Sequence, residues 1–224
     1  MFVALVGGAL LVSAHAQKLD VEYVPTPQSI VKRMLDMAAV GPKDYVIDLG
    51  CGDGRIAIAA ALRGARALGV DLDPNRIKEA TVLTLYLLPE LNRKLSPTIL
   101  KLKPGTRVVS HEFDMDPWVA DRHVEIGENE IYYWVVPAPV AGNWQVKSGE
   151  QEFTVAIKQS FQRIRGTAQI GKRSVPLRNA KMQGDKIEFV VTLNGKRVPF
   201  RGTVDGDKMS GKNNAGVEWT ASRS

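Results

Sequence analysis

The alternation of apolar and polar positions divides the chain into an α/β part followed by a β-rich part. In the first part, apolar runs long enough for buried strands occur at residues 45–49, 67–71, 81–88 and 107–113. Ahead of them, apolar residues at helical spacing predict a helix over residues 28–39. We expect these runs to form one parallel sheet, because strands that alternate with helical segments pair in parallel.

Beyond residue 120 the pattern becomes that of short strands separated by turn residues. The expected strands cover residues 131–136, 144–146, 153–162, 166–170, 186–193, 199–204 and 217–221. Asn194-Gly195 and Asp205-Gly206 lie between alternating segments and are typical of hairpin turns. This part is therefore predicted to be an antiparallel meander, a small sheet or open barrel with Trp144 and Trp219 in its core. Its first strands are expected to complete the preceding sheet, which gives an α/β domain over residues 17–145 and a β-rich module over residues 146–224.

Three glycines, Gly50, Gly52 and Gly54, separate the first apolar run from an Ala-rich helix. A strand, a Gly-rich turn and a helix are how α/β domains hold an anionic or nucleotide-like ligand, because glycine lets the backbone approach it closely. The spacing Asp-x-Gly-x-Gly-x-Gly differs from the Gly-x-Gly-x-x-Gly of dinucleotide binders, and no Gly-Lys-Ser/Thr follows. Asp71 ends the second run, where an acidic side chain can accept hydrogen bonds from two ribose hydroxyls. The alternative is a Gly-rich turn with no ligand.

The run DLGCGDGRIAIAAA, followed by ALGVDLDP, resembles motif I and the acidic second strand of class I S-adenosylmethionine-dependent methyltransferases. The GDGRI form is similar to a subgroup that includes small, hydrophobically anchored protein-lysine methyltransferases. The resemblance implies an α/β fold with a shortened Rossmann-like methyltransferase sheet, followed by the β-rich antiparallel C-terminal module. It also implies S-adenosyl-L-methionine as cofactor and methyl transfer to a protein lysine or another amine.

The resemblance also implies the residues of the site. Those assigned to the cofactor are Tyr23, Thr26, Asp48, Gly50, Cys51, Gly52, Gly54 and Asp71. The Tyr-Val-Pro segment at residues 23–25 is similar to a flap that covers the methionine end of the cofactor, with an ordinary entry loop as the alternative. In the family, the loop after the fourth strand lies beside the transferable methyl group. The corresponding residues, expected nearest the chemistry, are Tyr86, Pro89, Glu90 and Asn92.

Each of these residues also has a structural interpretation. Tyr86 could belong to the core, Pro89 could end a strand, and Asn92 could cap a helix. His111, at the end of the last run of the α/β part, could serve as a base or as a structural hydrogen-bonding group. A lysine acceptor must lose its proton before it attacks, and a desolvated site favours the neutral amine.

A segment of the family fold has no counterpart between Asp73 and Thr81. In the family, this region holds a full helix, a third strand, a loop with an adenine-recognising acidic residue and another helix. A strand-helix-strand unit takes about 30 residues, and the connection here is far shorter. Either the chain has an internal deletion that joins Ala80 to Thr81, or the segment is missing from this sequence. In both cases the adenine pocket loses one wall.

This gap leaves alternatives for function. The leading hypothesis is an exported methyltransferase that acts on a protein lysine or another amine. The second is a noncatalytic envelope protein, in which a core derived from a methyltransferase scaffolds a basic β module that binds a partner. A small-molecule methyltransferase is a third, because nothing in the sequence reports the size of the acceptor.

The first residues have the pattern of a secretory signal peptide. Residues 2–14 are almost wholly apolar, and Ala14-His15-Ala16 is a small-x-small cleavage site. A signal peptide over residues 1–16 predicts a mature chain that begins at Gln17 in the periplasm or outside the cell. No Lys or Arg precedes the apolar run, and a buried N-terminal helix is the alternative.

Charge and cysteine content restrict the partners. The net charge is +6, and residues 145–224 hold fifteen Lys or Arg against seven Asp or Glu. This basic part could meet an acidic protein or an anionic membrane surface, or be a solvated surface. No aromatic-rich RNA motif or recognition helix is evident, which disfavours nucleic acid. Cys51 is the single cysteine, so a disulfide within the chain and a cysteine-based zinc site are excluded, and we expect no metal. The oligomeric state stays open.

Overall fold

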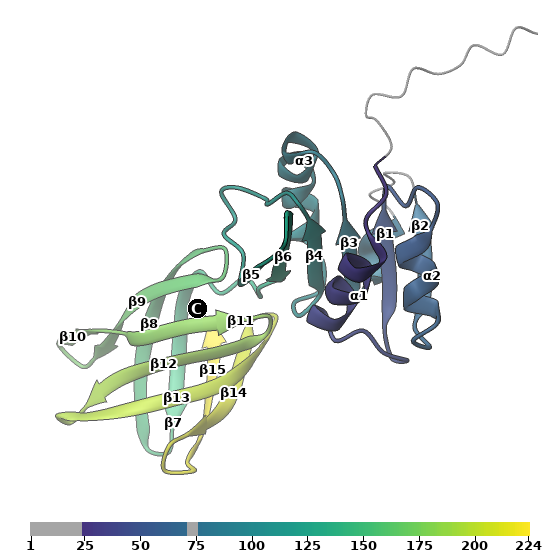
Figure 1. Ribbon diagram of the computed structural model, residues 1–224. Coiled ribbons are helices and arrows are strands. Elements are labelled where there is room, and N and C mark those ends of the chain that lie inside the picture. Colours follow the sequence, from purple (N-terminus) through teal and green to yellow (C-terminus); the bar gives the residue numbers. More distant parts are fainter. Residues whose placement is uncertain (1–23, 71–75) are drawn as a thin grey trace, which may run out of the picture.

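The computed structural model describes residues 24–70 and 76–224, which form two β-sheets (Figure 1). The predicted signal peptide, Tyr23 and Asp71 lie outside the described residues. The elements of the first sheet and its helices are α1 (Gln28–Met37), β1 (Tyr45–Leu49), α2 (Arg55–Ala61), β2 (Arg66–Val70), η1 (Arg76–Glu79), β3 (Val82–Leu85), α3 (Pro89–Ile99), β4 (Arg107–His111), β5 (Arg122–Ile126) and β6 (Asn129–Val135).

The first sheet has six strands in the order β2-β1-β3-β4-β6-β5. Strands β1 to β4 pair in parallel, and β6 then pairs antiparallel with both β4 and β5. The prediction of one parallel sheet from the apolar runs is therefore confirmed. Runs such as β3, in which every residue is buried, are expected where helices and loops cover both faces of a sheet.

The sheet is shortened at the β2 edge. Strand β3 pairs directly with β1, and only the 3₁₀ helix η1 is seen in the described part of the connection between β2 and β3. Strand β2 is the edge strand of the described sheet and is the most exposed of its four parallel strands. The family's third strand has no counterpart here, as the short connection predicted.

The two faces of the first sheet carry separate apolar clusters because side chains alternate along each strand. On one face, α1 and α2 pack over residues such as Val46, Val82 and Val109. On the other face, Ile47 and Leu83 lie in a cluster that includes Ile99 of α3. Thus helices cover both faces, and the strand ends are left to form a site. No helix of the described part of the chain is long and apolar enough to cross a membrane.

The second sheet is antiparallel and has nine strands in the order β10-β9-β8-β7-β15-β14-β13-β12-β11. Its strands are β7 (Gly142–Ser148), β8 (Gln151–Ser160), β9 (Arg163–Ile170), β10 (Arg173–Pro176), β11 (Arg178–Gln183), β12 (Lys186–Leu193), β13 (Lys196–Asp205), β14 (Lys208–Asn213) and β15 (Glu218–Arg223). The edges curl toward each other, and the backbone N–H of Leu177 donates to the carbonyl of Gly166 at 2.9 Å. The predicted β-rich antiparallel module is confirmed, and its sheet begins with β7 at Gly142.

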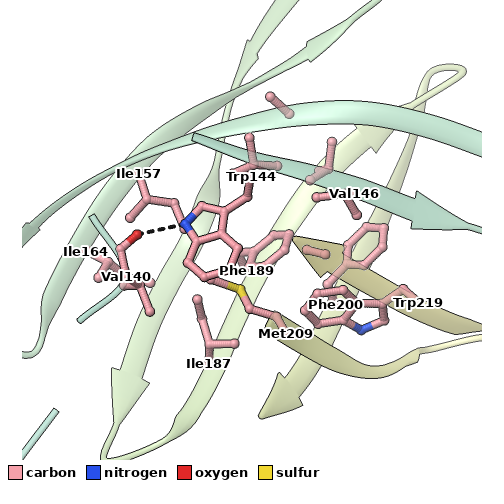
Figure 2. Close-up of a cluster of buried hydrophobic side chains, with 14 of the residues drawn as sticks. Val140, Trp144, Val146, Ile157, Ile164, Ile187, Phe189, Phe200, Met209 and Trp219 are labelled. Atoms are coloured by element: carbon pink, nitrogen blue, oxygen red, sulfur yellow. Dashed lines mark hydrogen bonds between the residues drawn. The ribbon is translucent and has the colours of Figure 1, made fainter. Parts of the chain in front are cut away.

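The module has its own aromatic core (Figure 2). Trp144 and Trp219 are buried in it, as predicted, beside Phe189 and Phe200. Trp144 Nε1 donates to the carbonyl of Val140 at 2.9 Å, so the polar end of the indole is satisfied inside the core. This core is distinct from the two clusters of the first sheet.

Candidate functional site

The carboxyl ends of β1, β3 and β4 lie side by side and bring three segments together. The register pairs Leu49 with Leu85 and Leu85 with Ser110, so the glycine loop, Tyr86 and His111 follow neighbouring strand ends. In open α/β sheets, ligands bind at this edge, outside the carboxyl ends of the strands. The site that the sequence predicted in three separate stretches is therefore assembled in one place.

The glycine loop requires glycine at the predicted positions. Gly50, Gly52 and Gly54 have φ of 76°, 51° and 76°, a left-handed conformation that other residues rarely adopt. A Cβ on Gly50 would lie 3.0 Å from Cδ2 of Leu87, in the loop after β3. Gly69 on β2 lets the loop approach as well, because a Cβ there would lie 2.6 Å from Cβ of Cys51. The loop thus offers backbone, rather than side chains, to a ligand.

Asp48 lies on β1 just before this loop, and it is 2% exposed. Its Oδ1 accepts a hydrogen bond from Thr84 Oγ1 at 2.7 Å. Burial raises the pKa of Asp48 to about 6, the Thr84 hydrogen bond opposes this rise, and the charge of Asp53 adds to it. A buried carboxylate without a charged partner attracts a cation, which fits the amino group of the methionine end of a cofactor.

The segment before α1 closes over the strand ends. Thr26 is 3% exposed, and its Oγ1 lies 3.2 Å from Nδ1 of His111. Its carbonyl accepts a hydrogen bond from Nη1 of Arg55, on α2, at 2.7 Å. Thr26 therefore joins the segment to β4 on one side and to the helix after the glycine loop on the other. The position suits the flap that the resemblance implied, although Tyr23 lies outside the described residues.

His111 makes structural hydrogen bonds with both ring nitrogens. Besides Thr26 at Nδ1, its Nε2 lies 3.0 Å from Oδ1 of Asn129 and 3.1 Å from Oε1 of Glu112. Burial lowers the pKa of His111, against the raising effects of Asn129 and Glu112. A neutral ring that accepts from Thr26 and donates from Nε2 satisfies this geometry. His111 therefore holds its neighbours in place, which is the structural alternative stated above.

The structure places the four residues expected near the chemistry in different surroundings. Tyr86 is half-buried, with its ring centroid 4.2 Å from that of His111 and 6.3 Å from that of Phe113. Burial, and secondly the charge of Glu112, raises the pKa of Tyr86. Pro89 and Glu90 are exposed in the first turn of α3.

Asn92 is wholly buried inside α3 and does not cap it, because the N-cap position is Leu88. Its Nδ2 donates to the carbonyls of Phe113 at 3.2 Å and Asp114 at 3.0 Å. Its Oδ1 accepts no hydrogen bond within the described part of the chain. Asn92 thus ties α3 to the loop after β4, so its observed contacts are with backbone rather than with open space.

Sequence analysis missed the residues just beyond β4. Glu112 follows His111, and its Oε1 also accepts from the backbone N–H of Glu130 at 3.3 Å. Phe113 stacks with Tyr86. The apolar run at 107–113 contains both residues, and the signal that set them apart was a polar residue at the end of a buried strand. Among the residues described, no group of His, Cys, Asp or Glu could hold a metal ion.

Comparisons with known proteins add family information to this geometry. Residues 26–82 match the family model described as Ribosomal protein L11 methyltransferase (PrmA). A protein-lysine N-methyltransferase of Saccharolobus islandicus is 38% identical over 146 residues, covering 51% of this chain and 91% of that protein. An ATP synthase lysine N-methyltransferase of Xenopus laevis is 28% identical over 155 residues, covering 55% of this chain and 66% of that protein.

A solved structure is similar over the same half. The crystal structure of an RNA methyltransferase from Salinibacter ruber, in complex with S-adenosyl-L-homocysteine, has a TM-score of 0.50 and 41% sequence identity. It covers 52% of this chain and 96% of that chain. In the Saccharolobus alignment, 51% of 224 residues is about 114, so about 30 of the 146 aligned positions have no residue in this chain. That shortfall agrees with the sheet that ends at β2.

Proposed function

Because the chain belongs to the class I S-adenosylmethionine-dependent methyltransferases, we propose that it methylates the side-chain amine of a protein lysine. The observation that carries the proposal is the arrangement beyond β3 and β4. There the rings of Tyr86 and Phe113 and the carboxylate of Glu112 lie together, beside the glycine loop. Aromatic rings and a carboxylate suit an alkyl chain that ends in a cation. The lysine methyltransferases among the relatives support the same acceptor.

In this proposal, the predicted cofactor residues divide the ligand between them. Asp48 faces the amino group of the methionine end, and Gly50, Gly52 and Gly54 admit its backbone. Asp71 takes the ribose hydroxyls, and the segment at Tyr23 and Thr26 covers the methionine end, with Cys51 in the loop. When bound, S-adenosyl-L-methionine supplies a methyl group on a sulfonium. With the adenine side open at the β2 edge, we expect weaker binding than in a chain with the third strand.

The residues of the chain position the acceptor rather than form a covalent intermediate. Methyl transfer needs the amine in line with the sulfonium, and most of the catalytic gain comes from holding the two in that geometry. Asn92 fixes the loop that follows β4, and His111 fixes Thr26 above it. The partly desolvated surroundings of Tyr86 favour the neutral amine that must attack.

The test is to incubate the purified protein with host proteins and S-adenosyl-L-methionine labelled in its methyl group. We expect label in protein, recovered as methyl-lysine after complete hydrolysis. The Asp71→Ala variant should weaken cofactor binding by about 5- to 150-fold, the cost of losing a paired hydrogen-bonding group. Glu79→Ala, an exposed acidic residue of the same connection, is its matched control.

Other outcomes of this assay would overturn the proposal. Label confined to small molecules or to nucleic acid would show a different acceptor. A folded protein that binds the cofactor and labels nothing would favour a scaffold derived from a methyltransferase.

Export of the chain belongs to the same proposal. The apolar run that ends in Ala14-His15-Ala16 supports cleavage before Gln17 and a periplasmic or secreted mature protein. N-terminal sequencing of the protein from its native host checks this, and Met1 retained in a cytosolic fraction would contradict it.

A further inference from the structure

The backbone at Glu112 has a conformation that a glutamate rarely adopts. Its φ is 65°, and the N–H of Phe113 donates to the carbonyl of His111 at 2.8 Å, two residues back. This is the γ-turn with positive φ at its centre, which is rare and strained for a residue with a Cβ. The turn is held from β6, because the N–H of Glu112 donates to the carbonyl of Glu130 at 2.8 Å.

A strained conformation in a folded protein needs a reason, since glycine or asparagine would adopt it at lower cost. Strain of this kind gathers at functional sites, where the surrounding structure imposes it. Glu112 follows β4 directly and lies within reach of Tyr86, whose pKa its charge helps to raise. The strained residue is therefore also the carboxylate beside the proposed acceptor site.

The two oxygens of Glu112 differ in their surroundings. Oε1 is held by Nε2 of His111 at 3.1 Å and by the backbone N–H of Glu130 at 3.3 Å. For Oε2, no hydrogen bond or ion pair is found within the described residues 24–70 and 76–224. The side chain is 25% exposed. One oxygen is thus anchored from inside the protein, and the other stays open to a ligand.

The rings beside this carboxylate provide the walls for an alkyl chain. Tyr86 and Phe113 stack with an angle of 21° between their planes. Phe113 is itself held, because its carbonyl accepts a hydrogen bond from the buried Asn92 at 3.2 Å. A lysine side chain has an apolar stem and a charged end, and it packs its stem on apolar surface while its end reaches a partner.

We propose that Glu112 is the residue that selects a cationic amine as acceptor, binding its ammonium group through Oε2 while Tyr86 and Phe113 hold the alkyl stem. The inference rests on the proposed function, and it names the group that distinguishes a lysine from a neutral acceptor. Glu112 acts in recognition, and the turn that strains its backbone aims the carboxylate at the incoming nitrogen.

The experiment is a titration by NMR of the full chain with n-butylammonium, which mimics the end of a lysine, and with the neutral 1-butanol. We expect the ammonium to bind at least about tenfold more tightly than the alcohol, as a charged hydrogen bond requires. Glu112→Gln should remove this preference and leave alcohol binding unchanged. Glu150→Gln, the same loss of charge at an exposed position on the second sheet, is the control that should behave as wild type.

A second variant separates recognition from a purely structural role. Glu112→Gly should lose the ammonium preference yet raise the melting temperature by about 2–4 °C, because glycine relieves the strain. A lower melting temperature would mean that Glu112 is kept for its contacts with His111 and Glu130. Equal ammonium binding by wild type and Glu112→Gln, or none by wild type, would overturn the proposal. The titration requires no methyl transfer, so its failure and the failure of the proposed function are separate results.

Discussion

At the scale of single residues, Asp48 carries a cost in the free protein. It is buried without a cationic partner in the described part of the chain, and burial raises its pKa from 3.8 to about 6. The gap between these values corresponds to about 3 kcal/mol of preference for the protonated form. Residues that bind a charged ligand often carry such a cost, which the ligand then removes.

The sign of the pH dependence follows from this raised pKa. Between pH 3.8 and about 6 the folded protein holds a proton that the unfolded chain has lost. The contribution to stability is therefore fully present below pH 3.8 and is lost as the pH rises through about 6. An amide in place of the carboxyl group has no such dependence.

We predict that Asp48→Asn becomes more stable relative to wild type as the pH rises from about 4 to about 7, by up to about 3 kcal/mol. Denaturant unfolding of both proteins across this range measures the difference. Cofactor binding should weaken below pH 6 in wild type and show no such step in the variant. A constant stability difference across the range would show that Asp48 is not buried as described.

At the scale of elements, β2 and the glycine loop depend on each other. Gly69 is in the interior of β2, where glycine normally weakens a strand, so a packing reason is expected. The reason is Cys51, whose Cβ and Sγ would lie 2.6 and 2.7 Å from a Cβ at position 69. The strand at the open edge of the sheet thus sets how closely the loop can fold back.

We predict that Gly69→Ala lowers stability by about 1–3 kcal/mol through overpacking and also weakens cofactor binding, because Cys51 must shift the loop. Thermal unfolding and calorimetric titration measure the two effects. Gly41→Ala is the matched control, because a Cβ on Gly41 meets nothing within 4 Å. If Gly69→Ala binds the cofactor as wild type does, the loop can move without loss.

At the scale of the whole molecule, Gln162 joins the two sheets. It lies in the turn between β8 and β9, and its Oε1 accepts from Nε1 of Trp118 at 2.9 Å. Its Nε2 donates to the carbonyl of Val119 at 2.7 Å and to Asp121 at 3.1 Å. Phe161 stacks on Trp118 beside these bonds. A single amide therefore satisfies a buried tryptophan of the first sheet from the second sheet.

We predict that Gln162→Ala costs about 1–3 kcal/mol, because Trp118 Nε1 loses its acceptor inside the protein. Differential scanning calorimetry should show the unfolding of the two sheets separating in temperature, since each has its own core. Gln169→Ala, whose exposed side chain bonds only the carbonyl of Gly171 among the described residues, should unfold as wild type does. The same separation in both variants would argue against Gln162 as the link.

Much of the architecture could be predicted from local pattern, and the errors have local causes. The parallel runs and the module core were visible because apolar residues recur at the period of each element. Strand β14 was missed because its residues, Lys208–Asn213, are mostly polar, with Met209 its buried residue. Strand β11 was missed for the same reason. Such strands are stabilised by their neighbours in the sheet, which a window of sequence does not contain.

The sequence by itself determined the glycine loop, the order of the elements and the shortened sheet. Each depends on neighbouring residues: φ above zero requires glycine, and a short connection leaves no room for a strand. Only the tertiary structure decided the partners of His111, which meets Thr26 from 85 residues away. It likewise decided the strained turn at Glu112, because the bond from β6 that holds this turn is formed only when the sheet assembles.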